Sequence, residues 1–166
     1  MIVVADTSVI LNLALVGHEN LLDAIFHEVV VPPAVHAEFI RLAESSGRFT
    51  GLALPQWIRV QPPESIPAAI ACDADLDPGE SQALALALEI RADGVLIDEA
   101  HARSIAIELG LTPIGVLGIL VRAKRNGLLP AVAPVIDDLL VKARFRASDD
   151  LIREVLRIAG ESQIRA

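Results

Sequence analysis

Four acidic residues occupy positions where a charge is costly unless something neutralises it. Asp6 and Asp98 each follow an apolar run of strand length, and Glu38 and Glu80 lie on the apolar stripes of two helical segments. Buried carboxylates are poorly solvated, and clustered carboxylates repel one another. Mg²⁺ and Mn²⁺ relieve both costs, because they prefer oxygen ligands and keep waters that leave room for a phosphate. The pattern therefore predicts a Mg²⁺ or Mn²⁺ site, whose usual chemistry is metal-assisted phosphodiester hydrolysis.

Ordinary structural roles compete with this interpretation for each acid taken alone. Asp6 is also placed to cap the helix that begins near Ser8, and Glu80 to favour the dipole of its own helix. Glu38 lies between Val35 and Leu42 on one apolar stripe, where a solvated role is harder to justify. The structural roles require four coincidences at one place, so a shared site is favoured.

The elements that must position these acids alternate along the chain. Apolar runs of strand length alternate with helical patterns, which is typical of a parallel α/β sheet. Strands are expected at residues 2–5, 28–31, 57–60, 94–97 and 112–114. Helices are expected at about 8–15, 21–26, 33–46, 78–91, 99–109, 116–125, 131–143 and 148–159. The segment 47–77 is the least regular, apart from the short strand within it.

The topology of a parallel sheet can bring the four acids together. Asp6 and Asp98 end strands, so they lie at the carboxyl edge of the sheet, where sites in open α/β folds form. Crossover helices begin at that edge, and Glu80 is in the first turn of its helix, with Glu38 near the second turn of another. All four acids are therefore expected to converge on one edge.

Composition limits the remaining possibilities. The 166 residues, 53% of them apolar, fit one domain at residues 1–160, followed by a frayed tail at 161–166. The net charge of −8 argues against a general nucleic-acid coat but leaves room for a nuclease. No segment resembles a signal peptide or a membrane span, and Cys72 is alone, so a soluble cytoplasmic protein is expected. Zinc is disfavoured because the histidines are scattered, at positions His18, His27, His36 and His101.

The order of the motifs resembles the PIN-domain family. The matching residues are Val4 to Ser8, the helical Glu38, Gly79 to Ala83, Leu96 to Glu99 with Ala102-Arg103, and the passage Ile114 to Leu120. The resemblance is closest to the prokaryotic VapC-like ribonuclease toxins and covers about residues 2–157. Two positions depart from that branch, which often has Asp where this chain has Glu80, and Thr or Ser where it has Leu96.

The resemblance implies a three-layer α/β/α fold with a central, mostly parallel sheet of about four to five strands. It also implies a Mg²⁺- or Mn²⁺-dependent endoribonuclease whose metal and catalytic acids are Asp6, Glu38, Glu80 and Asp98. The expected partners are an RNA substrate, a small antitoxin protein and a second copy of the chain. The high apolar content also favours a homodimer.

Several neighbouring side chains are candidates for holding those acids in place. Thr7, Ser8 and Asn12 follow the first strand, and Ser8 and Asn12 share a helix face, although capping and solvation explain them equally well. Glu99 is a possible fifth ligand, with a helix-dipole role favoured. Arg103 fits either a phosphate contact or an ion pair with Glu99. Basic residues gather further on, where solvated helix ends are favoured over contacts with RNA: Arg122, Lys124, Arg125, Lys142, Arg144 and Arg146.

Four rival functions differ from this one in class. A non-catalytic PIN-like interaction module would not need all four acids. A metal-dependent phosphatase of the haloacid-dehalogenase type would need an acid where Ser8 stands, and a receiver domain would need paired acids and a later lysine. A dinucleotide-binding domain would need a glycine fingerprint after the first strand.

Overall fold

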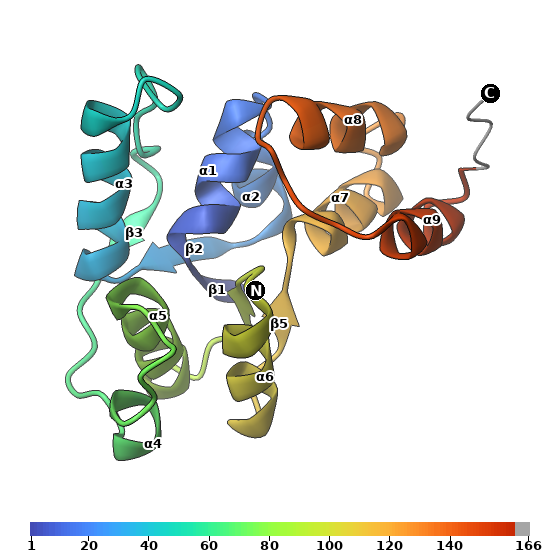
Figure 1. Ribbon diagram of the computed structural model, residues 1–166. Coiled ribbons are helices and arrows are strands. Elements are labelled where there is room, and N and C mark those ends of the chain that lie inside the picture. The colour runs from blue at the N-terminus through green and yellow to red at the C-terminus, as the bar shows by residue number, and fades with distance from the viewer. Residues whose placement is uncertain (162–166) are drawn as a thin grey trace.

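A parallel sheet of five strands forms the centre of the molecule (Figure 1). The computed structural model describes residues 1–161. The strands lie in the order β3-β2-β1-β4-β5, and all neighbours are parallel. Their bounds are β1 Ile2–Ala5, β2 Glu28–Val31, β3 Arg59–Val60, β4 Gly94–Leu96 and β5 Pro113–Ile114. The predicted α/β class and parallel sheet are confirmed.

Helices connect the strands and extend the chain beyond the sheet. Their bounds are α1 Thr7–Leu15, α2 Asn20–Ile25, α3 Pro33–Ser45, α4 Ala68–Ala71, α5 Pro78–Glu89, α6 Ala100–Glu108, α7 Val116–Arg125, α8 Ala133–Val141 and α9 Asp149–Ile158. Most agree with the sequence pattern within about two residues. The exception is α4, a single turn after Pro67 in the segment predicted to be irregular. Four residues are too few to show a helical hydrophobic period, so the sequence pattern does not predict this turn.

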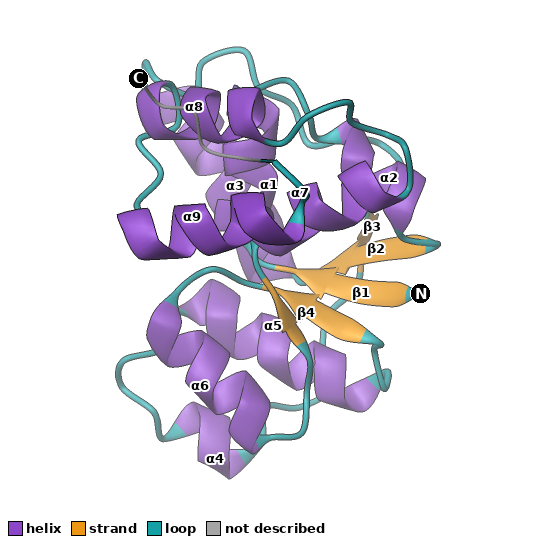
Figure 2. Ribbon diagram, turned by 90° about the vertical axis from the view of Figure 1, so that its right-hand side faces the viewer, coloured by secondary structure: helices purple, strands orange, loops and turns teal. Residues whose placement is uncertain are grey.

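The helices cover both faces of the sheet, which gives the three layers implied by the resemblance. Figure 2 shows α1, α2, α3, α7, α8 and α9 on one face and α4, α5 and α6 on the other. Alternate residues of β1 follow this division, since Val3 packs into the larger apolar core and Val4 into the smaller one. Both are fully buried, as expected of strands in a sheet that is covered on both sides.

Strand pairing brings two of the predicted acids to the same edge. Ala5 is in register with Leu96, and the Asp6 amide donates to the Leu96 carbonyl at 2.9 Å. Asp6 therefore directly follows β1, and Asp98 lies two residues beyond the end of the neighbouring β4. The first turns of α1, α5 and α6 begin at this edge, each with a carboxylate as its N-cap: Asp6, Asp77 and Glu99.

Glu161, the last residue that the structure describes, is bonded to α7 and to the start of α8. Its carboxylate accepts hydrogen bonds from the Val132 and Ala133 amides and pairs with Lys124 at 2.7 Å. Burial alone would raise the pKa of Glu161, but these three donors hold it below its usual range. The predicted frayed tail otherwise lies outside the described residues. Within residues 1–161, no helix has the length and apolar character needed to cross a membrane.

Candidate metal centre

Asp6 combines a helix cap with an unused oxygen. One carboxylate oxygen, Oδ2, accepts hydrogen bonds from the Ser8 hydroxyl at 2.9 Å and the Ser8 amide at 3.4 Å. The other, Oδ1, is buried and has no hydrogen-bond partner. Burial raises the pKa of Asp6 to about 6, despite these donors, and the nearby charge of Asp77 adds to the effect. The helix cap therefore accounts for Oδ2 but leaves Oδ1 without a structural role.

Glu38 enters the same region from α3. Its Oε2 accepts a hydrogen bond from the Thr7 hydroxyl at 2.7 Å, which ties α3 to the start of α1. Its Oε1 lies 3.8 Å from the Arg41 guanidinium, one turn along the helix. Thr7 is itself buried, so its hydroxyl fixes the direction of the Glu38 side chain. The expected supporting role of Thr7 has a physical basis in this contact.

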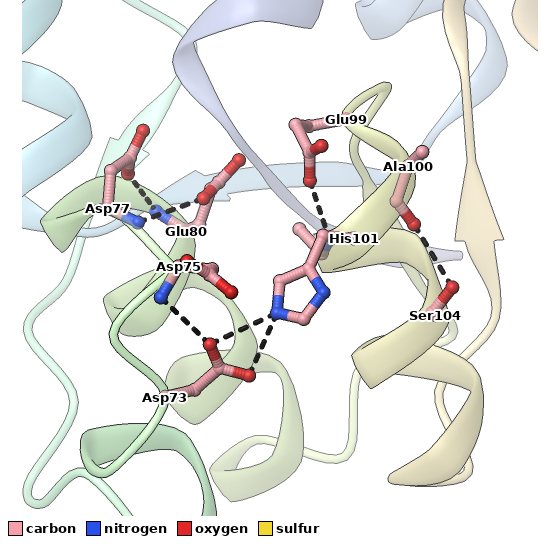
Figure 3. Close-up of polar contacts among 9 residues, drawn as sticks. Asp73, Asp75, Asp77, Glu80, Glu99, Ala100, His101 and Ser104 are labelled. Atoms are coloured by element: carbon pink, nitrogen blue, oxygen red, sulfur yellow. Dashed lines mark hydrogen bonds and ion pairs between the residues drawn. The ribbon is translucent and has the colours of Figure 1, made fainter.

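Glu80 and Asp77 hold the beginning of α5 together (Figure 3). The Asp77 carboxylate accepts from the Glu80 amide at 2.8 Å, and the Glu80 carboxylate accepts from the Asp77 amide at 2.9 Å. This reciprocal pair is a capping box. Glu80 is 5% exposed. Burial raises its pKa to about 7, helped by the charges of Asp77, Asp6 and Glu99. Three further carboxylates therefore lie close enough to act on Glu80.

Asp98 lies at the same edge but is held towards α7. Its Oδ1 accepts a hydrogen bond from the Val116 amide at 3.0 Å, and its Oδ2 is buried without a partner. Burial raises the pKa of Asp98, whereas the Val116 amide and the Arg103 charge lower it. The approach is close, because a Cβ atom at Gly115 would lie 2.6 Å from Oδ1. Gly115 therefore makes room for this carboxylate.

Most of these acids line one cleft, which has a volume of about 240 Å³. Asp6, Glu38 and Glu80 line it, together with Asp77 and Glu99. Asp98 is not among the described residues that line the cleft. The structure thus brings three of the four predicted acids together and adds Asp77, which the sequence analysis did not select. Asp77 looks like an ordinary helix cap in the sequence, and only the fold reveals its neighbours.

The donor set fits a hard divalent cation. Among the described residues, three side-chain oxygens are buried without a hydrogen-bond partner, and two of them belong to Asp6 and Asp98. Such atoms are costly unless something binds them. The donors around the cleft are carboxylate oxygens, which Mg²⁺ and Mn²⁺ prefer. The role of Asp6, Glu38, Glu80 and Asp98 as metal ligands stays a prediction.

The neighbouring candidates divide between the cleft and its surroundings. Ser8 lines the cleft and holds Asp6, whereas Asn12 is half-buried on α1 and does not line it. Glu99 lines the cleft and accepts from the Ala102 amide at 2.7 Å, which lowers its pKa. Arg103 donates to the Ile97 carbonyl at 2.9 Å, beside Asp98. The Arg103 charge also lowers the pKa of Asp98, and its expected contact with a phosphate stays a prediction.

A second group of possible ligands lies next to the cleft, beyond Glu99. Asp73, Asp75 and His101 each offer a ligand atom within 4.8 Å of the others. Among the described residues, this is the one group of three acidic, histidine or cysteine side chains that comes so close, and the acids of the cleft lie further apart. Figure 3 shows the His101 ring directed at Asp73, and its Nε2 lies 2.9 Å from Asp73 Oδ2. This hydrogen bond raises the pKa of His101 and lowers that of Asp73. In the sequence His101 is one of four scattered histidines with no ligand spacing, and its partner Asp73 lies 28 residues away.

Two comparisons with known proteins bear on the family of the chain. A family model described as a PIN domain matches residues 2–161, which is nearly the whole chain. A search of the curated proteins found no match. PIN domains are in general nucleases that use divalent metal ions. The five-stranded parallel sheet between two helical layers is consistent with that family. On the extent of this match, the chain belongs to the PIN-domain family.

Proposed function

We propose that this PIN domain is a metal-dependent endoribonuclease whose metal site is formed by Asp6, Glu38, Glu80 and Asp98. The observation that carries the proposal is the pair of buried carboxylate oxygens without partners, Asp6 Oδ1 and Asp98 Oδ2, at the ends of neighbouring strands. A fold does not leave two such atoms unsatisfied at one edge without cost. A divalent cation removes that cost and supplies the chemistry of the family.

Mg²⁺ or Mn²⁺ held by these carboxylates would supply Lewis-acid activation of water and stabilise charge that develops on a phosphate. Neighbouring residues of the chain hold these carboxylates in position. The Ser8 hydroxyl orients Asp6, the Thr7 hydroxyl orients Glu38, and the Val116 amide orients Asp98. Asp77 anchors Glu80 through the capping box. Each of these carboxylates is therefore held by a second group, and the free oxygens of Asp6 and Asp98 stay available to a cation, which limits reorganisation during the reaction.

The proposed reaction is hydrolysis of the RNA backbone. A water oxygen forms a bond to phosphorus, the bond from phosphorus to the ribose O3′ breaks, and O3′ takes a proton. The products carry a 5′-phosphate and a 3′-hydroxyl, because the nucleophile is water and not the ribose 2′-hydroxyl. Incubation of the protein with single-stranded RNA and Mn²⁺, followed by analysis of the product ends, tests this reaction. Cyclic phosphate ends, or cleavage that persists in EDTA, would contradict it.

We further propose that the nuclease is the toxin of a toxin–antitoxin pair and acts in the cytoplasm. The support is the order of the motifs, from Asp6-Thr7-Ser8 through Gly79-Glu80 to Asp98, which resembles the VapC-like branch. Expression should arrest growth, and co-expression of a small protein encoded next to this gene should restore it. Equal growth with the wild type and the Asp6→Asn variant would contradict the toxin role.

We also propose a homodimer. Large apolar side chains remain exposed on helices, including Val141 at 78% and Ile107 at 64%. Single exposed apolar side chains are ordinary, so the support for the dimer is the resemblance to PIN proteins together with the apolar content of 53%. Light scattering at high protein concentration should give twice the chain mass of 17.7 kDa. A monomer mass under those conditions would refute the dimer.

A further inference from the structure

A second cleft adjoins the acidic one, between α3 and the first turn of α5. It has a volume of about 360 Å³. Glu38 and Asp77 line both clefts, so the two hollows meet at these carboxylates. The second cleft is therefore next to the proposed metal site.

The walls of the second cleft are mostly small and apolar. Ala34 and Ala37 contribute from α3, and Pro78 and Gly79 contribute from α5. None of these four side chains is long enough to fill the space, and none carries a hydrogen-bonding group. A hydrogen bond from the Ala34 amide to the Gln82 side chain, at 3.1 Å, holds the two helices beside each other. The result is a fixed opening that suits a flat, weakly polar group.

Arg41 brings a positive charge to the second cleft, which it shares with the two carboxylates of Glu38 and Asp77. Among the described residues that line either cleft, it is the one cation. Its nearest acid is Glu38, at 3.8 Å, but the other Glu38 oxygen is already engaged by Thr7. The Arg41 side chain is 65% exposed. An exposed pair of this kind is weak, so the guanidinium keeps donors available for an anion.

Building on the proposed nuclease function, we propose that this cleft binds the nucleotide next to the scissile phosphate of single-stranded RNA. The base lies against Ala34, Ala37 and Pro78, and Arg41 holds the phosphate of that nucleotide. Guanidinium groups suit phosphate because their donors match its oxygens in pairs. Only an unpaired base can turn out of its stack to enter an opening of this kind. Walls without hydrogen-bonding side chains recognise shape, so sequence preference at this position is weak.

Binding of a fluorescent ten-nucleotide RNA of mixed sequence, followed by anisotropy with Ca²⁺ in place of Mn²⁺, tests the subsite. The Arg41→Ala variant should bind about five- to tenfold more weakly, as expected on losing one phosphate contact, and with a smaller dependence on salt. Arg157→Ala is the matched control, because Arg157 is also an exposed arginine paired with a glutamate three residues before it. It should bind like the wild type.

Two further comparisons distinguish the contact of the base with the apolar wall from the contact of the phosphate with Arg41. Ala37→Leu fills the cleft without changing its charge and should also weaken binding, with folding checked by circular dichroism. The same RNA in a blunt duplex should bind more weakly than the single strand. The subsite is overturned if Arg41→Ala binds like Arg157→Ala, if Ala37→Leu binds like the wild type, if the duplex binds equally well, or if the single strand does not bind.

The outcome for the subsite can be distinguished from the outcome for the nuclease. Metal-dependent cleavage with an unchanged KM in Arg41→Ala would leave the nuclease intact and overturn the subsite. Binding that depends on Arg41 and Ala37, without cleavage of any RNA, would support the subsite and contradict the nuclease.

Discussion

At the scale of single residues, the four acids differ in how much ordinary structure explains them. The capping box gives Glu80 a full structural role. The cap of α1 uses only one of the two carboxylate oxygens of Asp6. Asp98 replaces the missing side-chain cap of α7, because it accepts from the Val116 amide where Gly115 has no side chain. What structure leaves unexplained is the second oxygen of Asp6 and of Asp98. These two oxygens carry most of the argument for a cation.

Gly115→Ala tests the placement of Asp98. The new Cβ would lie 2.6 Å from Asp98 Oδ1, so the carboxylate must move away from the Val116 amide. We expect cleavage to fall by at least about tenfold and the free energy of unfolding to fall by about 1–3 kcal/mol. Chemical denaturation and an RNA cleavage assay measure these two effects.

Gly118→Ala is the control, since it lies in the same helix and its Cβ would meet only Ile114 at 3.7 Å. It should raise the free energy of unfolding by about 0.5–1 kcal/mol, as expected for glycine replaced within a helix. Equal activity of the two variants would show that Asp98 does not need its present position.

Thr7→Val tests the support of Glu38. The substitution keeps the shape of the side chain but removes the hydroxyl that holds Glu38 Oε2. Because groups that orient metal ligands typically contribute 10- to 100-fold in affinity, we expect Mn²⁺ affinity to fall by about that factor. Calorimetric titration measures it. Thr50→Val, which removes an exposed hydroxyl bonded to a backbone carbonyl, should leave the affinity unchanged. The same affinity in both variants would contradict the supporting role of the Thr7 hydroxyl.

At the scale of helices and strands, the beginnings of helices matter more than their lengths. The carboxyl edge of the sheet is where α1, α5 and α6 start, and each start contributes a carboxylate cap to the cleft. The positive ends of these helix dipoles favour the charged form of each acid, whereas burial favours the neutral form. For Asp6 and Glu80 burial prevails, since the pKa of each is raised.

Glu161→Ala tests how α7 and α8 are fastened together. It removes the acceptor for the Val132 and Ala133 amides and for Lys124, all in a partly buried setting. We expect the free energy of unfolding to fall by about 1–3 kcal/mol, because buried donors lose their partner. Glu154→Ala, which breaks only an exposed pair with Arg157, should cost less than about 0.5 kcal/mol. Equal costs would contradict the proposed anchoring.

Elements with a clear hydrophobic period could be predicted from the sequence, and so could the edge at which the acids meet. The short α4 could not, because four residues carry no period. The partners of the acids were also beyond sequence reasoning. Asp77 looks like any helix cap, and the turn of Asp98 towards Val116 depends on how close Gly115 comes to it. Contacts of this kind arise only when distant segments pack.

At the scale of the whole molecule, the acids at the cleft make the stability of the metal-free protein depend on pH. The folded-state pKa values of Asp6, about 6, and Glu80, about 7, lie above the ordinary values of 3.8 and 4.5. Between these values the folded protein binds more protons than the unfolded chain. This contribution to stability is therefore fully present below about pH 4 and is lost as the pH rises through about 6 to 7.

We therefore expect the metal-free protein in EDTA to melt at a higher temperature at pH 5.5 than at pH 8. Mn²⁺ should narrow this difference by stabilising the protein more at pH 8, where the carboxylates are charged. Asp6→Asn should reduce the difference in EDTA, because one of the two shifted groups is absent. Thermal unfolding at both pH values, with and without Mn²⁺, measures it. A higher melting temperature at pH 8 in EDTA would contradict the pKa shifts.

The measurement that bears most directly on the metal-dependent nuclease compares the wild type with Asp6→Asn on single-stranded and structured RNA, with Mn²⁺ and with EDTA. Asn keeps the volume of Asp6 but removes one charge from the site. We expect the wild type to cleave with Mn²⁺ and not in EDTA. Turnover by Asp6→Asn should fall by roughly two or more orders of magnitude, comparable to losing a main electrostatic contributor. The variant should fold as well as the wild type, because removing one crowded carboxylate relieves repulsion. Cleavage that is equal in the variant, or that persists in EDTA, would contradict the account.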